Sequence, residues 1–274
     1  MSTAVAIAEW VERLLPDRER AARLAAALRD EFGAGDEADS PERCRRIERV
    51  CHRFARHLTL EYFERAFPVP DKEKPTGWPP PDGLAIRAAR ANVAPVEHVG
   101  DAALLRLDSL ESWEFAGLFV EEAFAAAKGA RRLVLDLRHN GGGAMDTLAR
   151  IAGFVLGREG ELLATVTALT GVEECRTPVG AAWGGETVVL TSRRTYSSGE
   201  ALAYVLRNRG VRVIGERTPG AADHCVPVRV TRHVVALIPF AVVQDPVTGG
   251  NWEGTGVVPD VEVPEERALE IALG

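Results

Sequence analysis

The chain has 274 residues, of which 46% are hydrophobic and 27% charged, and this is the composition of a globular protein long enough to bury a large core. Its formal net charge of −7 gives no electrostatic support for a nucleic-acid partner. No apolar stretch approaches the roughly 18 residues that a membrane span needs, so no membrane partner is expected.

The N-terminus and the cysteines predict a cytoplasmic location. Residues 1–15 contain acidic residues before any basic one, which does not resemble a secretory signal. Cys44 and Cys51 lie seven residues apart on one face of a predicted helix, which indicates packing rather than a disulfide. Together with Cys175 and Cys225 they fit no metal-ligand spacing. We therefore expect reduced thiols, no metal and no cofactor.

Three amphipathic helices are predicted near the N-terminus, over residues 4–14, 18–32 and 41–56. In each of them apolar residues recur every three or four positions, which is typical of a helix with one buried face. A serine followed by proline opens the third helix. We predict a small helical N-terminal domain over residues 1–67, whose apolar faces could also support a homo-oligomer.

Residues 68–84 are predicted to be a linker. Six prolines lie between Pro68 and Pro81, with Gly77 and several charged residues among them. This composition favours a stiff, extended connection over a helix or a strand.

The chain from residue 85 to residue 274 alternates between strand and helix patterns. The predicted strands are 102–107, 132–137, 162–169, 187–191 and 211–214, and the predicted helices are 114–128, 145–156, 199–208 and 264–273. Residues 226–243 are rich in β-branched side chains, as in a hairpin. This order predicts an α/β domain with a largely parallel sheet.

A glycine-rich loop follows the predicted strand 132–137. Residues 140–143 read Asn-Gly-Gly-Gly, and a helix is predicted to begin near Met145. Glycines let the backbone turn its N–H groups toward an anion, and the start of a helix favours negative charge. The loop could therefore hold an oxyanion. The spacing is not G-x-G-x-x-G, which argues against a nucleotide, and a tight turn without any ligand is the alternative.

A second strand-to-helix turn contains Ser197, Ser198 and Glu200. A serine at such a turn can be displayed as a nucleophile at the edge of a sheet. The sequence is not the G-x-S-x-G elbow. The alternative is that one serine caps the helix, with Glu200 in its first turn.

Three segments together resemble one enzyme family. Residues 133–143 are similar to the strand and glycine loop of the tail-specific, or C-terminal-processing, serine peptidases. Residues 195–202 resemble their nucleophile segment, and residues 213–220 resemble the strand and turn that follow it. The resemblance extends from about residue 85 to the C-terminus and implies an α/β fold, a ClpP/crotonase-like αβ sandwich.

The family divides by its general base. In one branch a lysine directly follows a Gly-x-Thr-x-Gly turn, but Ala221 occupies that position here, which argues against a Ser-Lys dyad. The other branch includes the tricorn core protease and the repeats of interphotoreceptor retinoid-binding protein. It takes a histidine from the N-terminal region and a glutamate near the C-terminus, and the matching residues are His57 and Glu253. His139 and His224 remain alternative bases.

The resemblance therefore implies a triad of Ser197, His57 and Glu253. Serine needs a base that titrates near the operating pH, and histidine is the usual one. A carboxylate on the far side of the imidazole fixes its tautomer and stabilises the imidazolium. We predict Ser197 as the nucleophile, His57 as the general base and Glu253 as the orienting carboxylate.

Neighbouring residues complete the predicted site. The backbone N–H groups of Ser198 and of Gly141 or Gly142 are predicted to form the oxyanion hole. Tyr196 precedes the nucleophile and Trp252 precedes the glutamate, and both are predicted to line an apolar substrate pocket; packing in the core is the alternative for each of them.

The predicted function is hydrolysis of a peptide or small amide substrate through an acyl-enzyme. Only about eighty residues separate His57 from the glycine loop, which leaves no room for the PDZ domain that is common in this family. Recognition of a substrate's C-terminus by β-augmentation is therefore not expected. Two alternatives remain: a non-catalytic protein that binds a lipophilic ligand on the same scaffold, and a biosynthetic enzyme that passes the acyl group to an amine.

Overall fold

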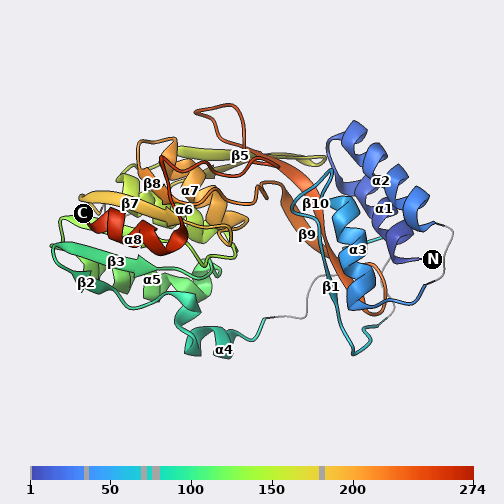
Figure 1. Ribbon diagram of the computed structural model, residues 1–274, viewed down its shortest axis with the longest axis horizontal. Helices are drawn as coiled ribbons and strands as arrows, with labels where there is room; N and C mark the ends of the chain where they lie inside the picture. Colours follow the sequence, from blue (N-terminus) through green and yellow to red (C-terminus); the bar gives the residue numbers. More distant parts are fainter. Residues whose placement is uncertain (1, 34–36, 69–72, 76–80, 179–182) are drawn as a thin grey trace. The chain divides into compact units, whose positions relative to one another are not determined.

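The computed structural model describes residues 2–33, 37–68, 73–75, 81–178 and 183–274 (Figure 1). Within them the chain forms two compact units. Unit 1 comprises residues 1–81, 166–173 and 223–243, and unit 2 comprises residues 82–165, 174–222 and 244–274. Each unit is described by itself.

Three helices open unit 1. They are α1 (Thr3–Leu14), α2 (Arg18–Phe32) and α3 (Pro41–Cys51). The side chains of Ser2, Asp17 and Ser40 accept hydrogen bonds from backbone N–H groups in the first turns of these helices, as N-caps do. The third helix ends at Cys51, earlier than predicted, because the chain then turns into a strand that the sequence pattern did not reveal.

A five-stranded sheet lies mostly in unit 1, while residues 162–165 of β5, 174–176 of β6 and the last residue of β10 are assigned to unit 2. Its strands are β1 (Thr59–Tyr62), β5 (Leu162–Ala168), β6 (Gly171–Arg176), β9 (His224–Arg229) and β10 (Val234–Gln244). The order is β1-β10-β5-β6, and β9 also pairs with β10. β10 is antiparallel to both β1 and β9, so the predicted hairpin is present.

The helices of unit 1 bury their apolar faces on this sheet. Side chains from α1, α2 and α3 form one core with Val228, Val234, Ala236 and Ile238 from β9 and β10. The predicted division into a helical domain 1–67, a linker 68–84 and a core 85–274 therefore differs from the observed one. The physical reason is that amphipathic helices need a partner surface, and the chain supplies it later. Most of the predicted linker, residues 69–72 and 76–80, lies outside the described residues.

A six-stranded sheet forms the centre of unit 2. Its order is β11-β8-β7-β4-β3-β2, with β2 (Glu97–Val99), β3 (Ala102–Arg106), β4 (Arg132–Asp136), β7 (Glu186–Thr191), β8 (Arg212–Gly215) and β11 (Val261–Glu262). The five strands from β3 to β11 are parallel, and β2 is antiparallel to β3. The predicted parallel sheet is confirmed.

Helices cover both faces of this sheet (Figure 1). They are α4 (Gly83–Ala88), the short 3-10 helix η1 (Arg90–Asn92), α5 (Trp113–Ala127), α6 (Met145–Leu156), α7 (Ser198–Arg207) and α8 (Glu265–Leu273). α8 packs against Val134, Val188 and Ile214 on one face. Alternate residues such as Leu133 and Val189 point to the other face, where α5, α6 and α7 lie, and they are fully buried. The predicted α/β sandwich is confirmed.

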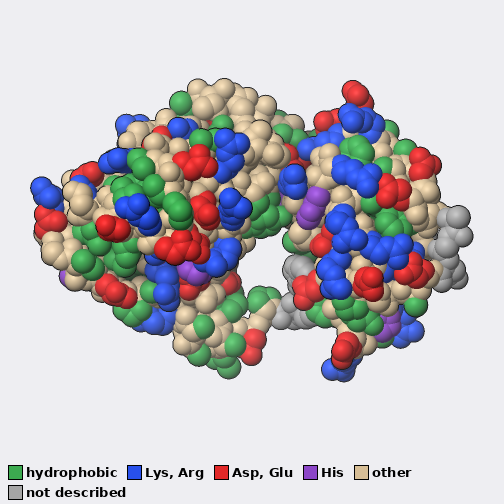
Figure 2. Space-filling model, in the orientation of Figure 1, with side chains coloured by type: hydrophobic (Ala, Val, Ile, Leu, Met, Phe, Trp, Pro, Cys, Tyr) green, Lys and Arg blue, Asp and Glu red, His purple; other side chains and the backbone are tan. Residues whose placement is uncertain are grey.

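The surface carries both signs of charge. On the face shown in Figure 2, basic and acidic side chains are interspersed rather than gathered by sign. Among the described helices, none combines the length and the apolar character needed to cross a bilayer.

All four cysteines are free thiols. Cys44 and Cys51 lie in the core of unit 1, as the helical spacing predicted. Burial, with help from the charges of Asp39 and Glu48, raises the pKa of Cys44 to about 11. Burial also raises the pKa of Cys51 strongly. Few thiolates are therefore present on these side chains at neutral pH.

We expect Cys44 and Cys51 to resist thiol reagents in the native protein. Titration with Ellman's reagent at about pH 8 should label them only as fast as unit 1 opens, because the thiolate is the reactive form. In concentrated urea all four cysteines should react at the rate of a free thiol. Rapid native labelling of Cys51, mapped by mass spectrometry, would contradict this packing.

Candidate active site

The glycine loop and the serine turn lie side by side. They follow β4 and β7, which are neighbouring parallel strands, so both turns leave the same edge of the sheet. The N–H of Tyr196 donates to the carbonyl of Asn140 at 2.9 Å. A Cβ added to Gly142 would lie 2.7 Å from the Cβ of Ser197, and the φ angle of Gly142 is +99°. Only glycine fits this close approach of the two backbones.

Buried polar side chains hold the two turns together. The Asn140 side chain donates from Nδ2 to the carbonyl of Leu107 at 2.9 Å and accepts the Gly142 N–H on Oδ1 at 2.9 Å. Thr195 Oγ1 donates to the carbonyl of Leu137 at 2.8 Å and accepts the Ser192 N–H at 2.9 Å. Asn140, Ser192 and Thr195 are fully buried. Sequence reasoning assigned them no role, although polar residues directly after buried strands are a usable signal.

Ser197 occupies an unusual backbone conformation at the start of α7. Its φ is 52° and its ψ is −122°, and it is half-buried. A positive φ is uncommon for a residue with a side chain, and such strain concentrates at functional sites. Ser198, the first residue of α7, is buried, and its Oγ donates to the carbonyl of Gly143 at 2.8 Å.

The predicted oxyanion donors differ in their availability. The N–H of Gly141 donates to the carbonyl of Asp108 at 3.1 Å, and the N–H of Gly142 donates to Asn140 Oδ1. Both predicted glycine donors are therefore engaged. Neither the Ser198 N–H nor the Gly143 N–H donates to an acceptor within the part of the chain that the structure describes.

A buried carboxylate, that of Glu200, lies behind the serine turn. It accepts hydrogen bonds from the N–H of Ser197 at 3.0 Å and from Thr218 Oγ1 at 2.5 Å. It also accepts the N–H groups of Gly220 at 2.7 Å and Ala221 at 2.9 Å. Burial raises the pKa of Glu200, and these hydrogen bonds oppose that rise. The sequence suggested only a residue in the first turn of a helix.

Glu253 lies in the segment that follows β10. Its Oε2 accepts the N–H of Ala222 at 2.7 Å. The neighbouring Trp252 is only 2% exposed, donates from Nε1 to the carbonyl of Ala221 at 3.2 Å, and packs with its ring centroid 5.0 Å from that of Tyr204. The expected role of Trp252 in lining a substrate pocket is therefore corrected, because burial makes it a core residue. Tyr196 is half-buried, and its predicted role stays a prediction.

His57 belongs to unit 1, whereas Ser197 and Glu253 belong to unit 2. It lies in the turn between α3 and β1 and is 8% exposed. Its Nδ1 makes a hydrogen bond to the carbonyl of Asp223, whose carboxylate pairs with Arg20 at 2.7 Å. Because a carbonyl oxygen only accepts, Nδ1 must carry a hydrogen, and in the neutral ring Nε2 is then the nitrogen without one.

The two alternative bases have different surroundings. His224 is half-buried near the ring of Phe240, and its pKa is lowered by burial and then by the charge of His57. His139 is exposed, and its Nε2 lies 3.4 Å from Nη2 of Arg194. It lines a cavity of about 220 Å³ in unit 2 to which Ser197 contributes no lining.

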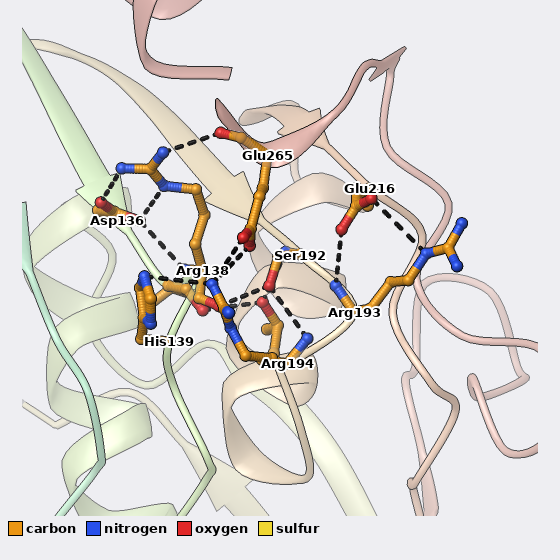
Figure 3. A network of polar contacts seen from close by, with 10 residues as sticks. Asp136, Arg138, His139, Ser192, Arg193, Arg194, Glu216 and Glu265 are labelled. Atoms are coloured by element: carbon orange, nitrogen blue, oxygen red, sulfur yellow. Dashed lines mark hydrogen bonds and ion pairs between the residues drawn. The ribbon is translucent and has the colours of Figure 1, made fainter. Parts of the chain in front are cut away.

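An ion-pair network beside that cavity joins three elements of unit 2 (Figure 3). Arg138 binds the carboxylate of Asp136 at 2.9 and 2.7 Å and donates to the carbonyl of Glu265 at 2.8 Å. Arg194 binds the carboxylate of Glu265 at 2.7 and 2.8 Å. The end of β4, the serine turn and the start of α8 are thus tied together. Among the described residues, no group of three acidic, histidine or cysteine side chains could hold a metal ion.

Residues 101–263 match the profile of Peptidase family S41. The chain belongs to this family. The resemblance predicted from the three segments is therefore confirmed, and the protein is a serine-type peptidase.

Solved structures show the same fold. The photosystem II D1 C-terminal processing protease is 17% identical, with 97% of this chain and 94% of that chain covered and a TM-score of 0.57. A putative peptidase from Parabacteroides merdae is 17% identical, with 98% and 95% covered and a TM-score of 0.65. A lipoprotein from Streptococcus agalactiae is 15% identical, with 98% and 93% covered and a TM-score of 0.60. At these identities the likeness concerns the fold.

Gly142→Ala should abolish most of the reactivity of the S41 site. The added Cβ would lie 2.7 Å from Ser197 Cβ, at a φ of +99°, so the serine turn would have to move. A misplacement of about 1 Å costs roughly 10²-fold in rate. The rate of labelling by a fluorophosphonate, corrected for the folded fraction, measures the effect.

Gly153→Ala is the matched control for this substitution. Gly153 lies within α6, where the nearest atom to an added Cβ would be Thr177 Cβ at 3.5 Å, an ordinary contact. This variant should keep the wild-type labelling rate and gain about 1 kcal/mol of helix stability. Equal labelling of the two variants would contradict the close approach at Gly142.

His224 should lower the free energy of unfolding at acid pH. Its pKa is lowered by folding, so below the ordinary histidine value of about 6.5 the unfolded chain binds more protons. The free energy of unfolding should therefore fall as the pH drops from about 7.5 to about 5.5, by at most about 1.4 kcal/mol per pH unit for one proton. Urea titrations should show a smaller fall for His224→Gln. An identical fall in both proteins would assign the pH dependence to other groups.

Proposed function

We propose that this peptidase cleaves peptide bonds through an acyl-enzyme on Ser197, with His57 as general base and Glu253 as the supporting carboxylate. The observation that carries the proposal is the strained turn at Ser197, where φ is 52° and the glycine loop touches the serine backbone. A strained, half-exposed serine at a strand-to-helix turn has the features of a displayed nucleophile.

The proposed reaction has two steps. His57 Nε2 takes the proton from Ser197 Oγ while the oxygen attacks the substrate carbonyl, and the protonated ring then gives that proton to the leaving amine. Water attacks the resulting ester with the same base and releases the acid. The Ser198 N–H and a glycine-loop N–H stabilise the oxyanion in both steps. Within the loop, Gly143 has the N–H that is not engaged among the described residues.

Ser197 is favoured over Ser198 by its surroundings. The hydroxyl of Ser198 is buried and donates to the carbonyl of Gly143, so it serves the structure of the loop. Its backbone N–H stands at the start of α7, where the helix dipole favours an anion.

The two supports of His57 are proposed to differ in role. The carbonyl of Asp223 sets the tautomer, because it can only accept from Nδ1. The carboxylate of Glu253, fixed by the N–H of Ala222, would stabilise the imidazolium by its charge. A buried Ala221 provides no amine at the position where the other branch has its lysine.

The proposed substrate is a peptide or a small amide. Tyr196 is half-buried beside the nucleophile and is proposed to contact the substrate's apolar part. Ser198 carries no charge, so no preference for basic substrate residues is proposed.

Fluorophosphonate labelling followed by peptide mapping tests the triad. The label should appear on Ser197 and be lost in Ser197→Ala. His57→Ala should slow labelling by roughly 10²- to 10⁴-fold, because general base catalysis contributes about that much. Glu253→Gln should slow it less, since the Asp223 carbonyl still sets the tautomer.

Ser198→Ala is the matched control because it keeps the backbone N–H proposed for the oxyanion hole. It should label within a few-fold of wild type. Label on Ser198 would place the nucleophile one residue later. Absence of label on the wild-type protein at any pH would favour a non-catalytic binder, and full labelling of His57→Ala would point to His139 or His224 as the base.

A further inference from the structure

Glu200 makes more contacts than a helix cap requires. A cap partner at this position needs only the N–H of Ser197. The carboxylate instead accepts hydrogen bonds from four donors. Three of these donors belong to residues 218–221, in the turn that follows β8 in the sequence. It is fully buried, so water cannot replace any of these bonds.

The two oxygens of the Glu200 carboxylate accept hydrogen bonds from different donors. Oε1 accepts from Thr218 Oγ1 and the Gly220 N–H, and so holds the turn itself. Oε2 accepts from the Ser197 N–H and the Ala221 N–H, and so joins the nucleophile's own backbone to that turn.

The same turn also fixes Glu253. The consecutive N–H groups of Gly220, Ala221 and Ala222 bind two carboxylates, the first two binding Glu200 and the third binding Glu253. One short backbone segment therefore sets the position of both glutamates.

The turn is in backbone contact with the segment around Glu253. Val257 donates its N–H to Thr218 Oγ1 at 2.8 Å, and a Cβ added to Gly256 would lie 1.9 Å from the carbonyl oxygen of Thr218. The N–H of Gly254 donates to the carbonyl of Gly220 at 2.8 Å. A shift of the turn would therefore move the Glu253 segment with it.

We propose that Glu200 is a positioning residue that sets Ser197 relative to the segment bearing Glu253. This inference rests on the proposed function of Ser197 and Glu253. Glu200 touches neither the substrate nor the reacting atoms. It acts through the Ser197 N–H on one side and through residues 218–222 on the other.

A neutral side chain of the same shape cannot accept all four of the hydrogen bonds that Glu200 accepts. In Glu200→Gln one oxygen becomes an NH₂ group, which cannot accept from a backbone N–H. The hydroxyl of Thr218 can reverse to accept from that NH₂, but the Gly220 N–H then loses its acceptor. We expect the turn to shift while the substrate-binding surface stays in place.

The test compares the maximal rate and the half-saturating concentration of fluorophosphonate labelling. Glu200→Gln should lower the maximal rate by roughly 10²-fold, as expected for a misplaced nucleophile, with the half-saturating concentration unchanged. Asp245→Asn is the matched control. Asp245 is 1% exposed, and within the described residues its carboxylate binds Arg209 and the N–H groups of Val247 and Thr248, all outside the serine turn. It should lower stability and leave the labelling rate unchanged.

Hydrogen exchange gives a readout that does not depend on activity. Peptides covering residues 195–202 and 217–223 should exchange faster in Glu200→Gln and not in Asp245→Asn. Should Glu200→Gln fail to fold, Thr218→Val removes one of the four donors, and we expect a smaller loss of maximal rate.

Each outcome has a distinct meaning. A folded Glu200→Gln, or failing that a folded Thr218→Val, with the wild-type maximal rate overturns the positioning role. Equal losses in Glu200→Gln and Asp245→Asn also overturn it, because buried carboxylates in general would then explain the effect. A wild-type protein that is never labelled contradicts the proposed function instead, and unchanged exchange in Glu200→Gln would then overturn the link between the two turns.

Discussion

The site depends on the contact between two backbone turns, the one after β4 and the one after β7. Adjacent parallel strands lie only about 4.8 Å apart, so two turns at the same edge compete for space. Gly142 removes the side chain that would collide with Ser197. The backbone groups that this contact takes from water are satisfied by buried Asn140 and Thr195. The surroundings thereby sustain a φ of 52° at Ser197, a conformation that costs of the order of 1–3 kcal/mol.

Local patterns sufficed for much of the fold in unit 2. The predicted helix 145–156 is α6 residue for residue, because an apolar period of 3.6 runs from the glycine loop to Gly157, which takes a left-handed φ of 63°. Unit 1 was harder to predict. Strand β1 is four residues long and exists because it pairs with β10, more than 170 residues later in the chain. A sequence window contains no trace of such a partner, so this region was predicted to be helical.

The site shows the same contrast between features that local sequence predicts and features that depend on residues distant in the chain. The family resemblance of the glycine loop and the serine turn predicted that they form one site, and the structure shows that both leave the same edge of the sheet because β4 and β7 are parallel neighbours. The role of Glu200 could not be predicted, because a glutamate three residues after a serine is also typical of an ordinary capping box. What distinguishes it are contacts to Thr218 and Gly220, which only the fold brings near. Trp252 shows the converse case: an aromatic beside a functional residue can line a pocket or belong to the core, and only its burial in the structure favours the core.

The division of the chain into units bears on the proposed triad. A segment of unit 2 ends at Ala222, and unit 1 resumes at Asp223. Ala222 holds Glu253 through its N–H, and Asp223 holds His57 through its carbonyl. Two consecutive residues thus contact the two proposed partners of Ser197, each within its own unit. The amphipathic helices bury their apolar faces on strands β9 and β10. The chain enters that hairpin through Ala222 and Asp223. The ion pair from Arg20 on α2 to Asp223 then fixes the entry point, so packing of the N-terminal helices determines where the carbonyl that orients His57 lies.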